Sequence, residues 1–307
     1  SFIGNWSYPL CSLIAMGLTP LISAEWNWRV QLLIPAILSL IATALAWRYF
    51  PESPRWLESR GRYQEAEKVM RSIEEGVIRQ TGKPLPPVVI ADDGKAPQAV
   101  PYSALLTGVL LKRVILGSCV LIAMNVVQYT LINWLPTIFM TQGINLKDSI
   151  VLNTMSMFGA PFGIFIAMLV MDKIPRKTMG VGLLILIAVL GYIYSLQTSM
   201  LLITLIGFFL ITFVYMYVCY ASAVYVPEIW PTEAKLRGSG LANAVGRISG
   251  IAAPYAVAVL LSSYGVTGVF ILLGAVSIIV AIAIATIGIE TKGVSVESLS
   301  IDAVANK

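Results

Sequence analysis

The stretch YVPEIWPTEAKLRGSGLANAVGRISGIAAP, residues 225–254, contains a charged turn followed by an apolar helix. About twenty small and apolar residues follow the turn, and Arg247 lies in the middle of them. An arginine about ten residues, or roughly 15 Å, inside such a helix would lie near the centre of a ~30 Å hydrocarbon layer. A guanidinium at that depth costs at least ~2.5 kcal/mol unless it has a partner. The stretch therefore indicates a membrane helix that carries a functional residue.

Apolar residues dominate the whole chain and occur in long blocks. Of its 307 residues, 57% are hydrophobic and 12% are charged. Blocks of about twenty apolar residues are long enough to span a bilayer as helices, and they are too numerous for the core of one soluble domain. The sequence therefore predicts an all-α, polytopic membrane protein with eight transmembrane helices. The predicted spans are residues 2–23, 30–49, 114–140, 150–171, 179–196, 200–226, 236–261 and 267–289.

Positive charge is distributed unevenly over the loops between these spans. Of the 21 Lys and Arg residues, all but three fall on one side, and one of those three is the intramembrane Arg247. Lys and Arg concentrate in cytoplasmic loops. We therefore expect a multi-pass protein of the cytoplasmic (inner) membrane with both chain ends in the cytoplasm. The net charge of +5 reflects mostly this asymmetry, and it indicates no nucleic-acid partner.

Cysteine and histidine usage argues against several classes of site. The three cysteines lie far apart, each inside an apolar block, which is typical of small core residues. Histidine, the commonest metal ligand and general base, does not occur. We therefore expect no metal site, no cofactor and no catalytic residues, and a membrane enzyme is the least favoured class of function.

Residues 50–112 form the only long polar segment between spans. Its first part places Trp56, Leu57, Ala66 and Val69 at near-helical spacing between charged residues, which predicts short amphipathic helices along the membrane face. Its second part is rich in proline and polar residues, which is typical of a linker. The segment is therefore predicted to be a hinge between a short bundle and a complete one.

Two spans carry polar residues at helical spacing. In residues 236–261 a stripe of small and polar side chains includes Asn243 and Arg247. In residues 114–140 a second stripe lies close to the midpoint of the span. It consists of Asn125, Gln128, Tyr129 and Asn133, with Trp134 beside it. Two polar stripes at matching depth predict a shared cavity in which these residues bind a ligand.

Each of these residues also has an alternative role. Polar residues in membrane helices form interhelical hydrogen bonds worth ~0.6 kcal/mol each, which is the alternative for Asn125, Gln128 and Asn133. The alternative for Arg247 is a salt bridge to a helix outside this chain, because no acidic residue lies in the middle of a span.

Tyrosines and glycines give two further patterns. Tyr217 and Tyr220, three residues apart in the span 200–226, either line the cavity or pack in the core. Small residues four apart permit close helix approach, so packing is the predicted role of two glycine pairs. These pairs are Gly159 with Gly163, and Gly246 with Gly250.

Four short motifs lie in the polar connections between the spans. They are PESPRWL (51–57), DKIPRK (172–177), PEIWPTEAKLRG (227–238) and ETKGVSVE (290–297). In this order and spacing, the set resembles the cytoplasmic signatures of the major facilitator superfamily, in its metabolite and sugar porter branch. The resemblance covers the whole chain, from the fifth helix to the C-terminus of that fold.

The resemblance implies a division of the chain into four parts. Residues 1–49 would be the last two helices of the N-terminal half, and 50–112 a cytoplasmic loop. Residues 113–289 would be the C-terminal six-helix half, and 290–307 a cytoplasmic tail. The first four helices of the fold would be absent. The mechanism implied is rocking of two six-helix halves about a central site.

Departures from the sugar porters concern the substrate site. When the seventh helices are aligned, the sugar porters' glutamine pair becomes Ala123 and Met124, and the tryptophan of their tenth helix becomes Ala223. Residues 236–261 instead resemble the organic ion and niacin transporter group, whose eleventh helix has a charged residue seven before a proline. Arg247 precedes Pro254 by the same interval. In that group an arginine at this place implies anionic substrates.

The motifs also imply an inner gate. By resemblance, charge networks that close the inner side would join Glu52 with Arg55, Asp172 with Arg176, and Glu228 with Arg237. Exposed ion pairs are individually worth only ~0 to 1 kcal/mol, which suits a latch that opens in every cycle. Two glycines of the gate pattern are replaced, by Met168 and Pro175.

The sequence thus predicts a secondary active transporter that moves a small organic anion, an aromatic or aliphatic monocarboxylate, together with protons. Its expected partners are this small-molecule substrate, protons and the lipid bilayer. A neutral sugar or polyol porter is the alternative within transport, favoured by PESPR and ETKG. A nutrient sensor that binds but does not transport is the alternative from another class, and the lack of a long signalling tail speaks against it.

Overall fold

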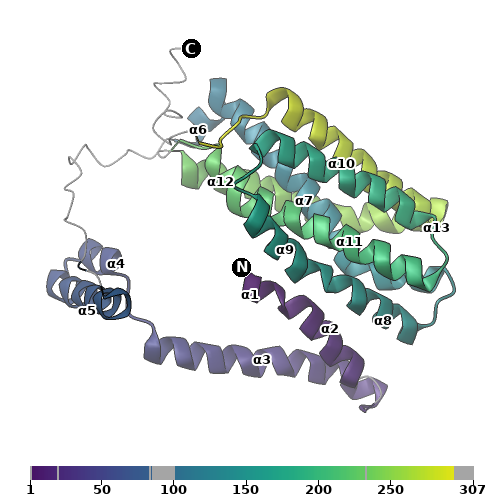
Figure 1. Ribbon diagram of the computed structural model, residues 1–307, viewed down its shortest axis with the longest axis horizontal. Helices are drawn as coiled ribbons and strands as arrows, with labels where there is room; N and C mark the ends of the chain where they lie inside the picture. Colours follow the sequence, from purple (N-terminus) through teal and green to yellow (C-terminus); the bar gives the residue numbers. More distant parts are fainter. Residues whose placement is uncertain (1, 19–20, 83, 85–100, 232–233, 294–307) are drawn as a thin grey trace. The chain divides into compact units, whose positions relative to one another are not determined.

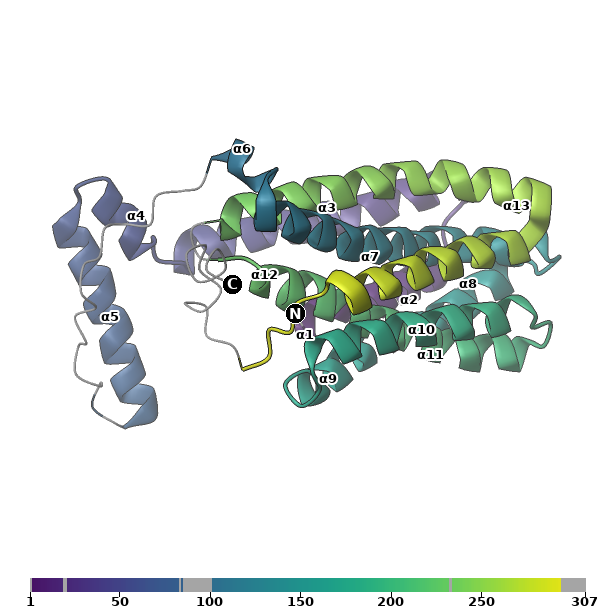
Figure 2. The ribbon, with the colours of Figure 1, turned by 90° about the horizontal axis from the view of Figure 1, so that it is seen from above.

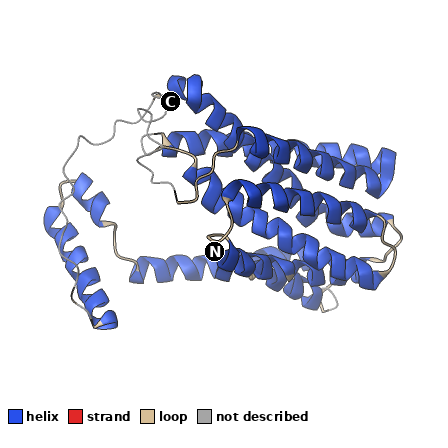
Figure 3. Ribbon diagram, turned by 45° about the horizontal axis from the view of Figure 1, so that its top comes forward, coloured by secondary structure: helices blue, strands red, loops and turns tan. Residues whose placement is uncertain are grey.

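The structure is a computed structural model that describes residues 2–18, 21–82, 84, 101–231 and 234–293. All regular structure among these residues is helical (Figure 3). The described chain divides into two compact units, one of Ser1–Gly17 with Pro97–Lys307 and the other of Leu18–Ala96. The prediction of an all-α fold is therefore confirmed.

The larger unit contains the helices labelled α1, α2 and α6 to α13 in Figure 1. Their bounds are α1 Phe2–Asn5, α2 Ser7–Leu18, α6 Tyr102–Leu105, α7 Gly108–Thr141, α8 Leu146–Met157, α9 Gly159–Val170, α10 Arg176–Ser195, α11 Met200–Val218, α12 Val226–Glu228 and α13 Lys235–Ile287. A π-helix, η1 (Cys219–Tyr225), joins α11 to α12.

Six helical segments in the described residues are long and apolar enough to cross a membrane. They are Trp28–Tyr49, Gly108–Thr141, Leu146–Val170, Arg176–Ser195, Met200–Glu228 and Lys235–Ile287. The last has 53 residues, which would extend about 80 Å as a straight helix, more than twice a ~30 Å hydrocarbon layer. Gly265, with φ 65° and ψ −160°, breaks it. Figure 2 shows α13 turning back on itself, so its two arms correspond to the predicted spans 236–261 and 267–289.

The predicted span 2–23 differs most from the structure. A turn at Trp6 separates α1 from α2, and α2 has 12 residues, fewer than the ~20 that a crossing needs. The predicted span 150–171 is also interrupted, at Phe158 between α8 and α9. Pro161 has no N–H to donate to the carbonyl four residues earlier, which accounts for a break in the helix there. Of the eight predicted crossings, seven thus have a segment of sufficient length.

Glycines set how closely the helices of the larger unit pack. Helix α9 lies beside α11 and α10 beside the C-terminal arm of α13 (Figures 1 and 2). A Cβ atom on Gly163 would collide with the main-chain carbonyl of Thr212 on α11. A Cβ atom on Gly246 would lie 2.9 Å from the Cβ atom of Leu121 on α7. The predicted packing role of these glycines is therefore confirmed.

The smaller unit consists of α3 (Ala24–Tyr49), α4 (Pro54–Ser59) and α5 (Tyr63–Thr81). Leu57 of α4 and Ala66 of α5 are both 2% exposed and form the small core of the α4–α5 hairpin. Gly82 ends α5 in the left-handed conformation, with φ 65°. The linker expected after these helices falls on residues outside the described part of the chain. The four-part division into N-terminal half, loop, C-terminal half and tail stays a prediction.

Candidate substrate-binding site and inner gate

Arg247 projects from the N-terminal arm of α13 and its side chain is exposed. Its Nη1 atom donates a hydrogen bond to the hydroxyl of Tyr129 on α7. The two helices approach closely enough for this contact because Gly250 presents no side chain. A Cβ atom there would lie 3.2 Å from the Tyr129 ring. Among the described residues no carboxylate lies within ion-pair distance of Arg247.

The remaining polar residues of the two stripes surround this contact. Asn125, 2% exposed, lies one turn before Tyr129 and donates from Nδ2 to the Leu121 carbonyl at 2.7 Å. Its Oδ1 atom has no hydrogen-bond partner among the described residues. Asn243 lies one turn before Arg247, is exposed, and donates to the Ser239 carbonyl at 2.9 Å.

The C-terminal end of the α7 stripe is more open. Asn133 is exposed and Trp134 is half-buried, one turn beyond Tyr129. Gln128 is half-buried as well. The structure thus brings together Arg247 and Tyr129, and it places the other stripe residues within about one helical turn of that pair.

Tyr217 and Tyr220 have a different environment, since they are only 1% and 0% exposed. The Tyr217 hydroxyl donates to the Val120 carbonyl at 3.1 Å. The Tyr220 ring stacks on Tyr225 with centroids 5.0 Å apart. The structure does not bring these two tyrosines to the exposed face that carries Arg247, and packing in the core accounts for their positions.

A second polar cluster lies where α9, α10, α12 and the segment after α13 meet. The guanidinium of Arg176 donates to both carboxylate oxygens of Glu228, at 3.1 Å each, and to Asp172 at 3.3 Å. Thr291 donates from its hydroxyl to the same Glu228 carboxylate at 2.5 Å. Arg176 is nearly buried, with 8% of its side chain exposed, whereas Asp172 is 89% exposed. The Glu228 contact is therefore the less screened of the two ion pairs.

Glu290 was not singled out as a site residue from the sequence, although it begins the ETKG motif. Its carboxylate accepts hydrogen bonds from the main-chain N–H groups of Arg176, at 2.7 Å, and Lys177, at 3.2 Å. These N–H groups begin α10 and have no partner within the helix, so Glu290 caps α10 from 114 residues away. Burial favours a higher pKa for Glu290, but these N–H groups, that of Lys292 and the Arg176 charge outweigh it and lower the pKa.

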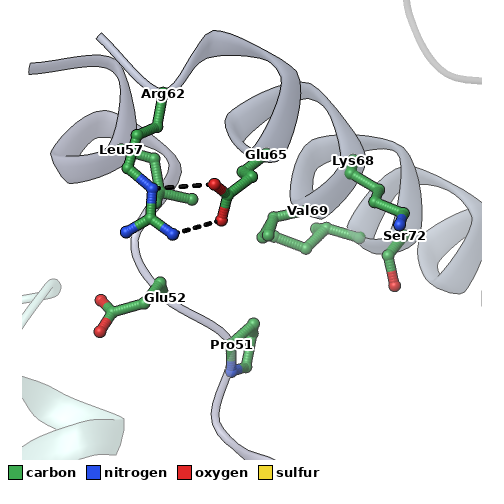
Figure 4. A pocket seen from close by; sticks show the side chains of 9 residues that line it. Pro51, Glu52, Leu57, Arg62, Glu65, Lys68, Val69 and Ser72 are labelled. Carbon is green, nitrogen blue, oxygen red and sulfur yellow. Dashed lines mark hydrogen bonds and ion pairs between the residues drawn. The ribbon is translucent and has the colours of Figure 1, made fainter. Parts of the chain in front are cut away.

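The other gate residues predicted from the sequence are Arg237, Glu52 and Arg55. Arg237 lies over the Tyr102 ring, with Cζ 5.3 Å from the centroid. Glu52 contributes to a cavity of about 530 Å³ in the smaller unit (Figure 4). There Arg62 forms two hydrogen bonds with Glu65, which raise the pKa of Arg62 with a smaller contribution from Glu52. The side chain of Arg55 lies outside the described part of the structure.

Comparison with known protein families gives a match over nearly the whole chain. Residues 7–303 match the family described as "Sugar (and other) transporter". The chain belongs to this family. As a family member with six segments of crossing length in its described part, it is a multi-pass membrane protein.

Relatives of the chain include two bacterial proteins. The inner membrane metabolite transport protein YdjE of Escherichia coli is 44% identical over 302 residues, covering 98% of this chain and 66% of YdjE. The niacin transporter NiaP of Acinetobacter baylyi is 25% identical over 290 residues, covering 94% of this chain and 65% of NiaP. The chain thus spans just under two thirds of the length of these relatives, which are transport proteins rather than enzymes.

Solved structures of the xylose transporter XylE share the fold. A partially occluded, inward-open structure of XylE from E. coli superimposes with a TM-score of 0.69 at 18% identity, covering 96% of this chain and 63% of XylE. A second structure, titled a major facilitator superfamily proton:xylose symporter, gives 0.62 at 21% identity, covering 97% and 64%. The predicted major facilitator fold is confirmed.

Proposed function

We propose that the protein is a secondary active transporter of a small organic anion, a monocarboxylate or aromatic acid, and that it works by alternating access coupled to protons. The observation that supports this most strongly is the exposed Arg247, hydrogen-bonded to Tyr129 and unpaired with any described carboxylate. Within a family of membrane transporters, such a cation on a bundle helix is a natural contact for an anionic substrate.

Carboxylate chemistry suits the geometry of this pair. A guanidinium presents a planar fork of N–H donors that matches the two oxygens of a carboxylate. The Tyr129 hydroxyl accepts from Nη1 and so fixes the plane of the fork. In a site with little water, the attraction between fork and carboxylate is far stronger than in bulk solvent. Asn125 and Asn243, about one turn away, would contact the remainder of a small substrate.

The polar cluster around Arg176 is the proposed inner gate. Its contacts join α10 to α12 and to the segment after α13. An exposed ion pair contributes ~0 to 1 kcal/mol, which applies to the pair of Arg176 with the 89% exposed Asp172. The less exposed Glu228 would hold the gate more strongly. Coupling to protons is proposed from the likeness to a proton symporter, and the location in the inner membrane from the name of YdjE.

Uptake of radiolabelled benzoate into cells that express the intact protein tests this function. We expect Arg247→Ala to abolish uptake while leaving membrane expression unchanged. Arg79→Ala, which removes an exposed arginine of α5, is the matched control and should transport normally. Normal uptake by Arg247→Ala would refute the anion site.

A neutral sugar or polyol porter is the second candidate, because the family description and the XylE likeness both favour it. Competition separates the two functions. Excess unlabelled benzoate should block transport of the labelled acid, whereas excess xylose should leave it unchanged. Block by xylose would favour the sugar porter.

A further inference from the structure

Gly246 and Gly250 lie about one turn apart on the N-terminal arm of α13, and both contact α7. A Cβ atom on Gly246 would lie 2.9 Å from the Cβ atom of Leu121, which is fixed to the main chain of α7. A Cβ atom on Gly250 would instead meet one edge of the Tyr129 ring, 3.2 Å from Cδ2 and 3.3 Å from Cε2. Gly246 therefore limits how closely the two helices approach, whereas Gly250 leaves room for an aromatic side chain.

The ring of Tyr129 carries the hydroxyl that accepts the hydrogen bond from Arg247. A methyl group on Gly250 would push the contacted edge of the ring by a few tenths of an ångström. The ring can yield by tilting, which displaces the hydroxyl oxygen, or by turning about its long axis, which rotates the lone pairs of that oxygen. Either movement misaligns the hydrogen bond, and hydrogen bonds weaken steeply with poor alignment.

The orientation of Arg247 depends on this one contact. Its side chain is exposed, and the Tyr129 hydroxyl is its only hydrogen-bond partner among the residues that the structure describes. A long arginine side chain has many rotamers, so it is free to change its orientation once the contact is lost. The absence of a side chain at Gly250 is thus transmitted through the Tyr129 ring to the guanidinium.

We propose that Gly250 is a positioning residue for anion recognition. By leaving room for the Tyr129 ring, it lets the hydroxyl hold the Arg247 guanidinium in the orientation that receives a carboxylate. This inference rests on the proposed function and deepens it, because it assigns part of the selectivity for a carboxylate to a residue that has no side chain. It also separates two glycines whose spacing alone predicted only helix packing.

Binding of benzoate and of its neutral analogue benzamide to Gly250→Ala tests this role. Gly250 is not among the glycines with a positive φ, and alanine is the better helix former, so the variant is expected to fold. Titration calorimetry on the purified intact protein measures both dissociation constants. We expect benzoate to bind about two- to tenfold more weakly than to the wild type, the effect of losing one hydrogen bond. Benzamide affinity should change less than about twofold, since benzamide carries no charge for the guanidinium to attract.

Gly191→Ala is the matched control. A Cβ atom on Gly191 would also meet an aromatic ring, that of Phe270, at 3.3 Å. This contact joins α10 to the C-terminal arm of α13, and the phenylalanine ring has no hydroxyl. Thermal unfolding of both glycine variants measures the cost of each added methyl group to stability. Gly191→Ala should keep the wild-type affinities for benzoate and benzamide, whatever its melting temperature.

A double variant shows whether Gly250→Ala acts through the Tyr129 hydroxyl. In Tyr129→Phe the ring remains and the hydroxyl is gone, so the hydrogen bond to Arg247 is already lost. Adding Gly250→Ala to Tyr129→Phe should then weaken benzoate binding by less than about twofold further, because two changes that remove the same contact are not additive.

The outcomes separate this role from the anion site itself. Wild-type benzoate affinity in Gly250→Ala, or a full additional loss in the double variant, overturns the positioning role and leaves the anion site standing. Benzoate binding that survives Arg247→Ala refutes the anion site, and the positioning role with it. A loss that occurs in Gly250→Ala, but not in Gly191→Ala and not on top of Tyr129→Phe, establishes the positioning role.

Discussion

Replacing Glu290 by glutamine should destabilise the end of the bundle at which α10 begins. The carboxylate of Glu290 accepts from the first two N–H groups of α10, at 2.7 and 3.2 Å, and from Lys292 at 3.2 Å. Glutamine keeps one acceptor oxygen but loses the charge, whereas alanine loses every contact.

The size of the effect follows from these contacts. A hydrogen bond to a charged group contributes about 1.5–3 kcal/mol and a neutral one about 1 kcal/mol. Because Glu290 is partly exposed, we expect Glu290→Gln to cost about 1 kcal/mol and Glu290→Ala about 2 kcal/mol. In a unit of this size, 1 kcal/mol corresponds to a lower Tm by about 2–4 °C.

The pKa of Glu290 adds a dependence on pH. Because the folded protein lowers this pKa below its ordinary value of 4.5, the stabilisation is fully present above that value. It declines as the pH falls through the lower, folded-state pKa. The difference in Tm between wild type and Glu290→Gln should therefore be largest near neutral pH and shrink in acid.

Thermal unfolding in detergent, followed at pH 7 and at pH 4, measures both effects. Glu75→Gln, on the exposed surface of α5, removes the same charge and should leave Tm unchanged. Equal Tm values for the two variants at pH 7, or a Glu290→Gln deficit that grows in acid, would refute the capping role.

Two further predictions concern helix packing and the arginine contact. Gly163→Ala should lower the free energy of unfolding by about 1–3 kcal/mol, because the new Cβ atom would collide with the Thr212 main chain. Gly182 has open space around it, so Gly182→Ala should be neutral or slightly stabilising in the same thermal unfolding experiments. Tyr129→Phe should weaken benzoate binding about two- to tenfold, because Arg247 loses the hydrogen bond to the Tyr129 hydroxyl. Titration calorimetry measures this affinity. An unchanged affinity would mean that the hydroxyl does not orient the guanidinium.

Much of the fold could be predicted from the sequence, because the bilayer imposes a simple rule on length and polarity. The gap between the spans 236–261 and 267–289 anticipated the turn at Gly265, and small-residue spacing anticipated the approach at Gly163. The short first span was not anticipated, since apolar composition alone does not show where a helix breaks.

The candidate site was harder to predict, because spacing along one helix does not identify the neighbouring helix. Tyr217 and Tyr220 suggested a common lining face, but the π-helix that begins at Cys219 widens the turn and changes the register there. Tyr129 and Arg247 came from separate stripes, and only the packing of α7 on α13 shows that they touch. The role of Glu290 depends on a contact across 114 residues that no local pattern reveals.

The affinity of the intact protein for benzoate relative to benzamide tests the anion site most directly, since the two ligands are similar in shape and differ in charge. We predict a preference for benzoate of at least about fivefold, lost in Arg247→Gln, because a charged hydrogen bond exceeds a neutral one by about 1 kcal/mol or more. Equal binding of benzoate and benzamide by the wild type would contradict the proposal that Arg247 recognises an anion.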